Sequence, residues 1–288
     1  MEPNLFEPES EEPASDPLRQ ALEDAAQSSL EFQEKLNLSK KLEKLLGDLV
    51  RFRDRSWLLH IKSACERELE FLKGLRSQSH PSIQVIEDLY RGAQSGAPGV
   101  VQALPGDLER LSKEASLVLD FSRSRHPRYY FGEDGFIEVQ VNDRRQTADV
   151  GTREGRLALM PADAGAIIET VKAEVERLFR RKFSGGRFLQ ELRAAHLAVL
   201  KGKKGLDGDP VPIREIYQSI ARKSKTYKKD EFLVDLSALV THGPAEVKGM
   251  RFELQQTKDT AEGVLLLGAA GRGMVNLLLF KKPEVNTP

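Results

Sequence analysis

Clustered Lys and Arg side chains are the strongest candidates in this chain for binding a ligand. Residues 177–204 hold nine Lys and Arg residues and a single Glu, and more cations follow around position 225. Lys and Arg at this density can neutralise the phosphate groups of a nucleic acid, although a basic run is also typical of a solvated helix face. The candidate DNA contacts are Arg180, Arg181, Lys182, Arg187, Lys201, Lys203, Lys204, Arg222, Lys223, Lys225, Lys228, Lys229 and Arg272.

Other chemistries find little support in the residue spacing. The five His residues are scattered, and none lies at metal-ligand spacing from another His or Cys. The Gly-rich segment 268–273 looks like a phosphate-binding loop in composition, but it separates two expected strands and does not precede a helix. We therefore expect no enzyme activity, no metal and no cofactor.

Most of the candidate contacts lie in the C-terminal third, residues 184–283, where the hydrophobic period predicts a defined order of elements. Apolar residues three and four apart indicate helices, and apolar-rich runs that end in Gly turns indicate strands. The expected elements are a helix at 186–200, a short strand at 211–213, helices at 214–223 and 228–240, and strands at 250–257, 263–267 and 274–280.

This order, a helix-turn-helix unit followed by a hairpin, resembles the winged-helix superfamily. The resemblance rests on element order rather than on a motif, and it implies a last helix that enters the DNA major groove. The helix expected in that place carries Asp230, Glu231 and Asp235, which phosphate groups would repel. We therefore expect contacts mainly to phosphate, without base readout. Many winged helices dock proteins instead, and an acidic third helix favours that use.

Residues 126–183 are predicted to form a small β-hairpin region followed by a helix. The period changes to two near Arg128, and a turn signal at 133–135 favours a hairpin. The expected elements are strands at 129–131, 136–141 and 157–160 and a helix that begins at Asp163. A second wing-like unit here would make the chain similar to the accessory subunits of SMC–kleisin complexes, which carry tandem winged helices.

Residues 16–125 are predicted to be helical, beginning with a long helix, a helical hairpin or a coiled coil. Two apolar series alternate at four- and three-residue spacing, and each is too short to establish a coiled coil by itself. Their helical partner is either the 81–125 segment of the same chain or a second copy in a homodimer. Several Gly and Pro residues predict a loop at 92–106. The two series are Leu18, Leu22, Ala25, Ser29, Phe32 and Leu36, and then, after a two-residue phase change, Leu38, Leu42, Leu45, Leu49 and Phe52.

Composition bounds the remaining possibilities. The chain has 44 Lys and Arg and 44 Asp and Glu, so no net charge draws it as a whole to nucleic acid or membrane. Residues 1–15 are rich in Glu and Pro, which predicts a disordered acidic tail. Cys65 is the one cysteine, which excludes an intrachain disulfide and fits a reducing cytoplasm. No apolar run approaches the ~20 residues that cross a bilayer, so we expect a soluble, cytoplasmic protein.

The expected fold class is mainly α with an α+β part, and the expected function follows from the basic clusters. The first hypothesis is a non-enzymatic DNA-binding winged-helix protein whose N-terminal helices mediate assembly. The alternative is a protein–protein adaptor subunit of a larger complex, for example an SMC–kleisin-like or defence-system assembly, in which the winged helix docks a protein partner. Charge-driven binding of DNA would favour the first hypothesis over the second.

Overall fold

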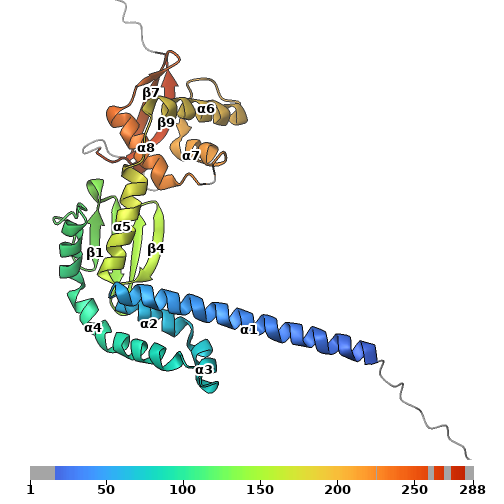
Figure 1. Cartoon of the computed structure of the whole chain (residues 1–288). Coiled ribbons are helices and arrows are strands. Elements are labelled where there is room, and N and C mark those ends of the chain that lie inside the picture. Colours follow the sequence, from blue (N-terminus) through green and yellow to red (C-terminus); the bar gives the residue numbers. More distant parts are fainter. Residues whose placement is uncertain (1–16, 225, 259–262, 269–273, 283–288) are drawn as a thin grey trace, which may run out of the picture.

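The computed structural model describes residues 17–224, 226–258, 263–268 and 274–282. Over these residues the chain forms three parts in sequence order, which together make a curved, elongated molecule (Figure 1). A long N-terminal helix and two antiparallel sheets confirm the expected combination of a mainly helical region with α+β structure. The acidic tail expected at 1–15 lies outside the described residues.

The N-terminal part consists of four helices. The base of α1 packs against the helices that follow it, because Leu45, Leu49 and Phe52 are buried in one cluster with Ile61 and Ile86. The base of α1 packs chiefly against α2, and Ile86 of α4 belongs to the same buried cluster. The four helices are α1 (Pro17–Asp54), α2 (Leu58–Arg67), α3 (Leu69–Ser77) and α4 (Ile83–Glu114).

Helix α4 is continuous through the segment for which the sequence predicted a loop, so that prediction is wrong. Ala97 and Leu104 of this segment, and Leu108 just after it, are buried in the core of the middle part. Their burial outweighs the low helix propensity of the Gly and Pro residues around them. Pro98 and Pro105 each remove a backbone N–H from the helix, and α4 bends along its length in Figure 1.

The middle part is a four-stranded antiparallel sheet covered by α5 (Ala164–Phe179) and the end of α4. Alternation explains its buried face, since Ile137, Val139 and Val141 are buried and the polar residues between them are not. The sequence predicted a hairpin and one further strand, and β3 was not predicted. The strands pair in chain order: β1 (Arg128–Phe131), β2 (Ile137–Asn142), β3 (Thr147–Thr152) and β4 (Gly155–Pro161), with a short 3-10 turn η1 (Glu133–Gly135) after β1.

One buried carboxylate joins the N-terminal helices to the middle part. Asp163, the residue before α5, accepts hydrogen bonds from the backbone N–H groups of Leu59 and His60 at 3.1 and 2.9 Å. Its Oδ2 also lies 2.6 Å from Nδ1 of His60. The carboxylate therefore satisfies donors at the start of α2, where a negative charge is favoured by the helix dipole.

The C-terminal part contains every element that the periodicity predicted, to within a few residues. Its sheet has the strand order β5-β9-β7-β6, with β8 paired to β9. The helices cover the sheet around a core that includes Phe188, Ile216, Phe232, Leu236 and Phe280. The elements are α6 (Gly185–Lys203), β5 (Val211–Pro212), α7 (Ile213–Ala221), α8 (Lys229–His242), β6 (Glu246–Val247), β7 (Met250–Thr257), β8 (Val264–Leu265) and β9 (Met274–Lys281).

Candidate nucleic-acid interface

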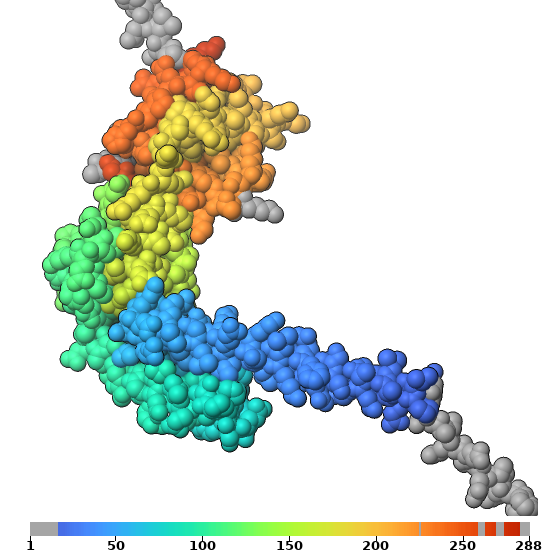
Figure 2. Space-filling model, in the orientation of Figure 1, coloured from blue at the N-terminus to red at the C-terminus, as the bar shows by residue number. Residues whose placement is uncertain are grey.

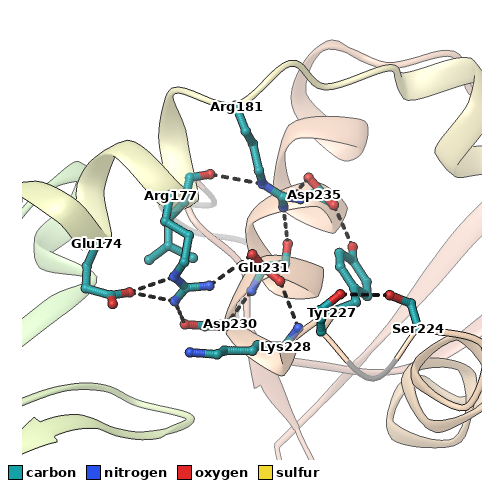
Figure 3. A network of polar contacts seen from close by, with 11 residues as sticks. Glu174, Arg177, Arg181, Ser224, Tyr227, Lys228, Asp230, Glu231 and Asp235 are labelled. Atoms are coloured by element: carbon teal, nitrogen blue, oxygen red, sulfur yellow. Dashed lines mark hydrogen bonds and ion pairs between the residues drawn. The ribbon is translucent and has the colours of Figure 1, made fainter.

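Two of the basic residues near 180 lie in a network of ion pairs between α5 and α8, which we call the α5–α8 junction (Figure 3). Arg177 pairs with Glu174 of its own helix at 2.7 Å and with Glu231 of α8 at 3.1 Å. Its guanidinium also forms a short ion pair with Asp230. Three carboxylates therefore surround one cation that is itself only 24% exposed.

Arg181, two residues after the end of α5, makes the second half of the junction. Its guanidinium pairs with Asp235 at 2.6 Å and donates to the backbone carbonyl of Glu231 at 2.8 Å. The hydroxyl of Tyr227 donates to the other oxygen of Asp235 at 2.5 Å (Figure 3). Because Asp235 is 8% exposed, this carboxylate depends on Arg181 and Tyr227 for its hydrogen bonds.

The pKa shifts in the junction follow from burial and pairing. Burial lowers the pKa of Arg177, but its hydrogen bonds to Asp230 and Glu174 outweigh burial and raise it overall. Burial raises the pKa of Asp235, even though Tyr227 and Arg181 act in the opposite direction. Burial and the hydrogen bond to Asp235 raise the pKa of Tyr227. The junction thus keeps Arg177 charged and Tyr227 neutral at physiological pH.

Helix α8 is covered on its apolar sides as well. Phe232 and Leu236 belong to the C-terminal core, whereas Val234 packs into the core of the middle part. At its start, Lys229 pairs with Glu154 of the turn between β3 and β4. The acidic residues of α8 therefore face Arg177 and Arg181 within the protein, and α8 is built into the contact between the middle and C-terminal parts.

The structure divides the candidate contacts by their surroundings. Arg181 and Lys229 are engaged across the contact between the two parts. Lys228 lies at the start of α8, where its backbone N–H donates to Oε2 of Glu231 at 2.8 Å, and its side chain is exposed. Three others make exposed ion pairs of the kind that contribute little to stability: Arg180 with Glu176 at 3.7 Å, Arg187 with Glu191 at 3.2 Å and Lys203 with Glu215 at 2.7 Å.

Five candidates remain, and we call them the outer cations: Lys182, Lys201, Lys204, Arg222 and Lys223. All are exposed. None of their side chains has a hydrogen-bond or ion-pair partner among the residues that the structure describes. Lys201 and Lys204 lie at the end of α6, and Arg222 and Lys223 follow α7. Lys225 and Arg272, the two other candidates, fall outside the described residues.

Four of the outer cations lie in the basic part of the chain, residues 184–282, and Lys182 lies just before it. Residues 184–282 carry 17 Lys and Arg against 11 Asp and Glu, although the whole chain has no net charge. One of these cations is not available at the surface. Arg193 is 8% exposed, and its guanidinium donates two hydrogen bonds, of 2.6 and 2.5 Å, to the carboxylate of Asp207. Exposed cations without an ion-pair partner among the described residues include Lys201 and Lys204 at the end of α6 and Arg222 and Lys223 after α7.

The sequence missed the pairing of α5 with α8, although a signal for it was present. Arg177 and Arg181 are four residues apart, as are Glu231 and Asp235, and residues at that spacing share one helix face. Two helices with complementary faces were therefore visible in the chain. What the sequence did not specify is that these two faces meet, because residues 181 and 235 are distant in sequence.

The structure also bears on metal binding and membrane insertion. Within the described ranges, no group of three or more His, Cys, Asp and Glu side chains could hold a metal ion. Among the same residues, no helix is both long enough and apolar enough to cross a membrane.

Comparison of the chain with models of protein families, with curated proteins and with solved structures finds no match.

Proposed function

We propose that residues 184–283 form a winged-helix module and that the protein is a non-enzymatic DNA-binding protein that contacts mainly phosphate groups. The element order supports the module: α6, the short β5, then α7 and α8, then β7 and β9. The strand order supports it as well, because β9 pairs with both β5 and β7, as the returning strand of a wing does. A helix-turn-helix unit followed by such a hairpin is typical of this superfamily.

The observation that carries the DNA-binding proposal is the set of outer cations. Exposed Lys and Arg side chains with no internal carboxylate partner can bind phosphate oxygens without first breaking an ion pair. Each neutralised phosphate releases counterions, so binding through such contacts weakens steeply as salt rises. Base readout is not part of the proposal, because α8 is packed between the two parts and phosphate contacts carry no sequence information.

The test is fluorescence anisotropy of a labelled generic duplex with the full-length protein at several salt concentrations. A variant with all five outer cations changed to Ala is compared with a control in which five exposed cations of the middle part become Ala. The control loses the same charge at Arg125, Arg144, Arg145, Arg153 and Lys172. We expect the first variant to lose most of its affinity and about one unit of salt slope per lost contact, and the control to bind like the natural protein.

Either of two results would contradict DNA binding through the outer cations. The first is no binding of the duplex by the natural protein at low salt. The second is an equal loss of affinity in both variants, which would mean that the overall charge, and not the position of the cations, governs binding.

A second candidate function, a protein–protein adaptor, is favoured by one specific observation. The acidic face of α8 is occupied by Arg177 and Arg181, so the helix that a winged helix usually presents to DNA is used inside the protein. In this alternative, the remaining surface of the C-terminal part docks a protein within a larger complex. Binding to a co-encoded protein partner, without binding of the duplex at low salt, would favour the adaptor.

A further inference from the structure

The loop between α6 and β5 carries the most exposed large apolar side chain among the described residues of the C-terminal part. Leu206 is 77% exposed, whereas Leu197, the next of these side chains, is 42% exposed. Figure 2 shows the end of α6 and the residues after it, in gold, protruding from one side of the C-terminal part. A single exposed leucine is common on protein surfaces, so its meaning depends on how it is held and on its neighbours.

Two buried polar side chains of α6 fix the shape of this loop. Arg193, which is 8% exposed, donates two hydrogen bonds to the carboxylate of Asp207, at 2.6 and 2.5 Å. His196 is fully buried, and its Nε2 donates to the backbone carbonyl of Asp209 at 2.9 Å. Buried polar groups are costly without hydrogen-bond partners, so both side chains stabilise the conformation of the loop that supplies those partners. The loop is therefore fastened to α6 at two points, on either side of Gly208.

The backbone of Leu206 belongs to the same fastened turn. Its N–H donates to Oδ2 of Asp209 at 2.7 Å, and its carbonyl accepts from the N–H of Asp209 at 3.1 Å. Gly208 completes the turn with a φ of 105°, a conformation that glycine adopts without strain. The apolar side chain of Leu206 thus lies in solvent on a turn that is already ordered, and a partner that binds it loses little entropy in ordering the loop.

The charges of the loop indicate what kind of partner meets it. Both of its carboxylates are engaged by the hydrogen bonds just described, and the hydrogen bonds from Arg193 hold the pKa of Asp207 below its ordinary value. Lys201 and Lys204, which precede Leu206, are exposed and have no ion-pair partner among the described residues. The loop therefore presents free cations beside one apolar side chain, which fits a partner that has phosphate groups next to an apolar interior.

We infer that Leu206 is an apolar wedge that enters between neighbouring base pairs of a DNA duplex, while Lys201 and Lys204 bind the phosphate groups beside it. This inference rests on the proposed DNA binding and adds the shape of the DNA that is preferred. Leucine is one of the side chains that proteins insert between base pairs from the minor groove, where they kink the duplex. The cost of that kink depends on the DNA, so the wedge selects DNA that bends easily and requires no contact to base edges.

A membrane surface would also offer phosphate groups and an apolar interior, but the loop fits a duplex better. Even a whole myristoyl chain gives only marginal membrane binding, and one leucine side chain buries far less apolar surface. The cations also continue beyond the loop. Lys203 of α6 pairs with Glu215 in the first turn of α7 at 2.7 Å, and Arg222 follows the other end of α7, about 14 Å away along the helix. The cations thus follow a line, as the phosphate groups of a duplex do.

The test compares a fully paired duplex with a duplex of the same sequence that carries a central bulge of unpaired nucleotides, which lowers the cost of a kink. Binding of each labelled duplex to the full-length protein is measured by fluorescence anisotropy. We expect the natural protein to bind the bulged duplex about tenfold more tightly, because burial of one leucine side chain contributes an effect of this order.

Three substitutions assign the preference to the wedge. Leu206→Ser should bind both duplexes with the affinity that the natural protein has for the paired one, because the lysines remain. Leu206→Phe keeps an apolar wedge and should keep most of the preference. Leu197→Ser removes the other exposed leucine of this part, and as the matched control it should bind like the natural protein. Because these positions are exposed, urea unfolding of the variants should follow that of the natural protein.

The outcomes separate the wedge from DNA binding itself. Equal affinity of the natural protein for the two duplexes, or an unchanged preference in Leu206→Ser, would overturn the wedge and leave phosphate binding in place. No binding of either duplex at low salt would overturn both proposals. Sedimentation with vesicles of phosphatidylserine and phosphatidylcholine covers the membrane. Vesicle binding that Leu206→Ser abolishes, without a preference between the duplexes, would overturn the wedge and assign Leu206 to a lipid surface.

Discussion

Two sets of cations in this protein look alike in the sequence and differ in their surroundings. Arg177 and Arg181 of the α5–α8 junction are enclosed by carboxylates that are 4 to 19% exposed. The outer cations, which lie after α5 and at the ends of α6 and α7, are exposed and have no carboxylate partner among the described residues. A basic run in a sequence is therefore not one feature, because the carboxylates that the fold brings near it decide whether it holds the protein together or faces a partner.

The largest effect should come from removing an arginine of the junction. Arg177→Ala leaves the carboxylate of Asp230, which is 4% exposed, without its cation, and an unpaired buried charge is strongly unfavourable. We expect the free energy of unfolding to fall by about 3 kcal/mol, measured by urea unfolding followed by circular dichroism.

The neighbouring Arg180→Ala is the matched control. This arginine is 61% exposed and pairs with Glu176 at 3.7 Å, so its removal should change stability by less than about 0.5 kcal/mol. Equal losses for the two substitutions would remove the distinction between the junction and the surface.

A smaller effect is expected from the hydroxyl that supports Asp235. Tyr227→Phe removes a donor at 2.5 Å from a buried carboxylate, and hydrogen bonds to charged groups contribute about 1.5 kcal/mol or more. We expect a loss of roughly this size in thermal or urea unfolding. The control is Tyr217→Phe, because the hydroxyl of Tyr217 has no hydrogen-bond partner within the described residues. If both tyrosines lost the same stability, the ring rather than the hydroxyl would be responsible.

The smallest effect on stability should come from the outer cations. Changing all five to Ala removes no buried contact, and exposed substitutions of this kind usually change stability by less than about 0.5 kcal/mol each. Urea unfolding of this variant should therefore follow that of the natural protein, while its affinity for duplex DNA falls. A marked destabilisation would show that these residues serve the fold, and it would weaken their assignment as phosphate contacts.

Local patterns predicted the elements of this protein better than their contacts. The periodicity around Phe188, Ile216 and Phe232 located α6, α7 and α8, because each helix buries one face and each ends in a turn signal. The loop predicted at 92–106 shows the opposite case. There Gly and Pro indicate a break locally, but the burial of Leu104 and Leu108 against the middle sheet keeps α4 helical.

The candidate site could be predicted only in part, for the same reason. The sequence identified the basic clusters and the acidic character of α8 correctly. It did not separate Arg181 from Lys182, although the first pairs with Asp235 and the second is exposed. That difference depends on a contact between the end of α5 and α8, which are more than 50 residues apart in the sequence. Helix propensity and residue spacing are local properties, and they do not predict such a contact.

The most direct test of the account is lysine acetylation of the full-length protein with and without a generic duplex, followed residue by residue by mass spectrometry. We predict that Lys182, Lys201, Lys204 and Lys223 react quickly in the free protein and are protected by the duplex. Lys229, which is paired with Glu154 and 32% exposed, should react slowly in both cases, and Lys172 of the middle part should not change. Protection at Lys228 and Lys229 with no change at the outer cations would contradict the account, because the duplex would then contact the start of α8.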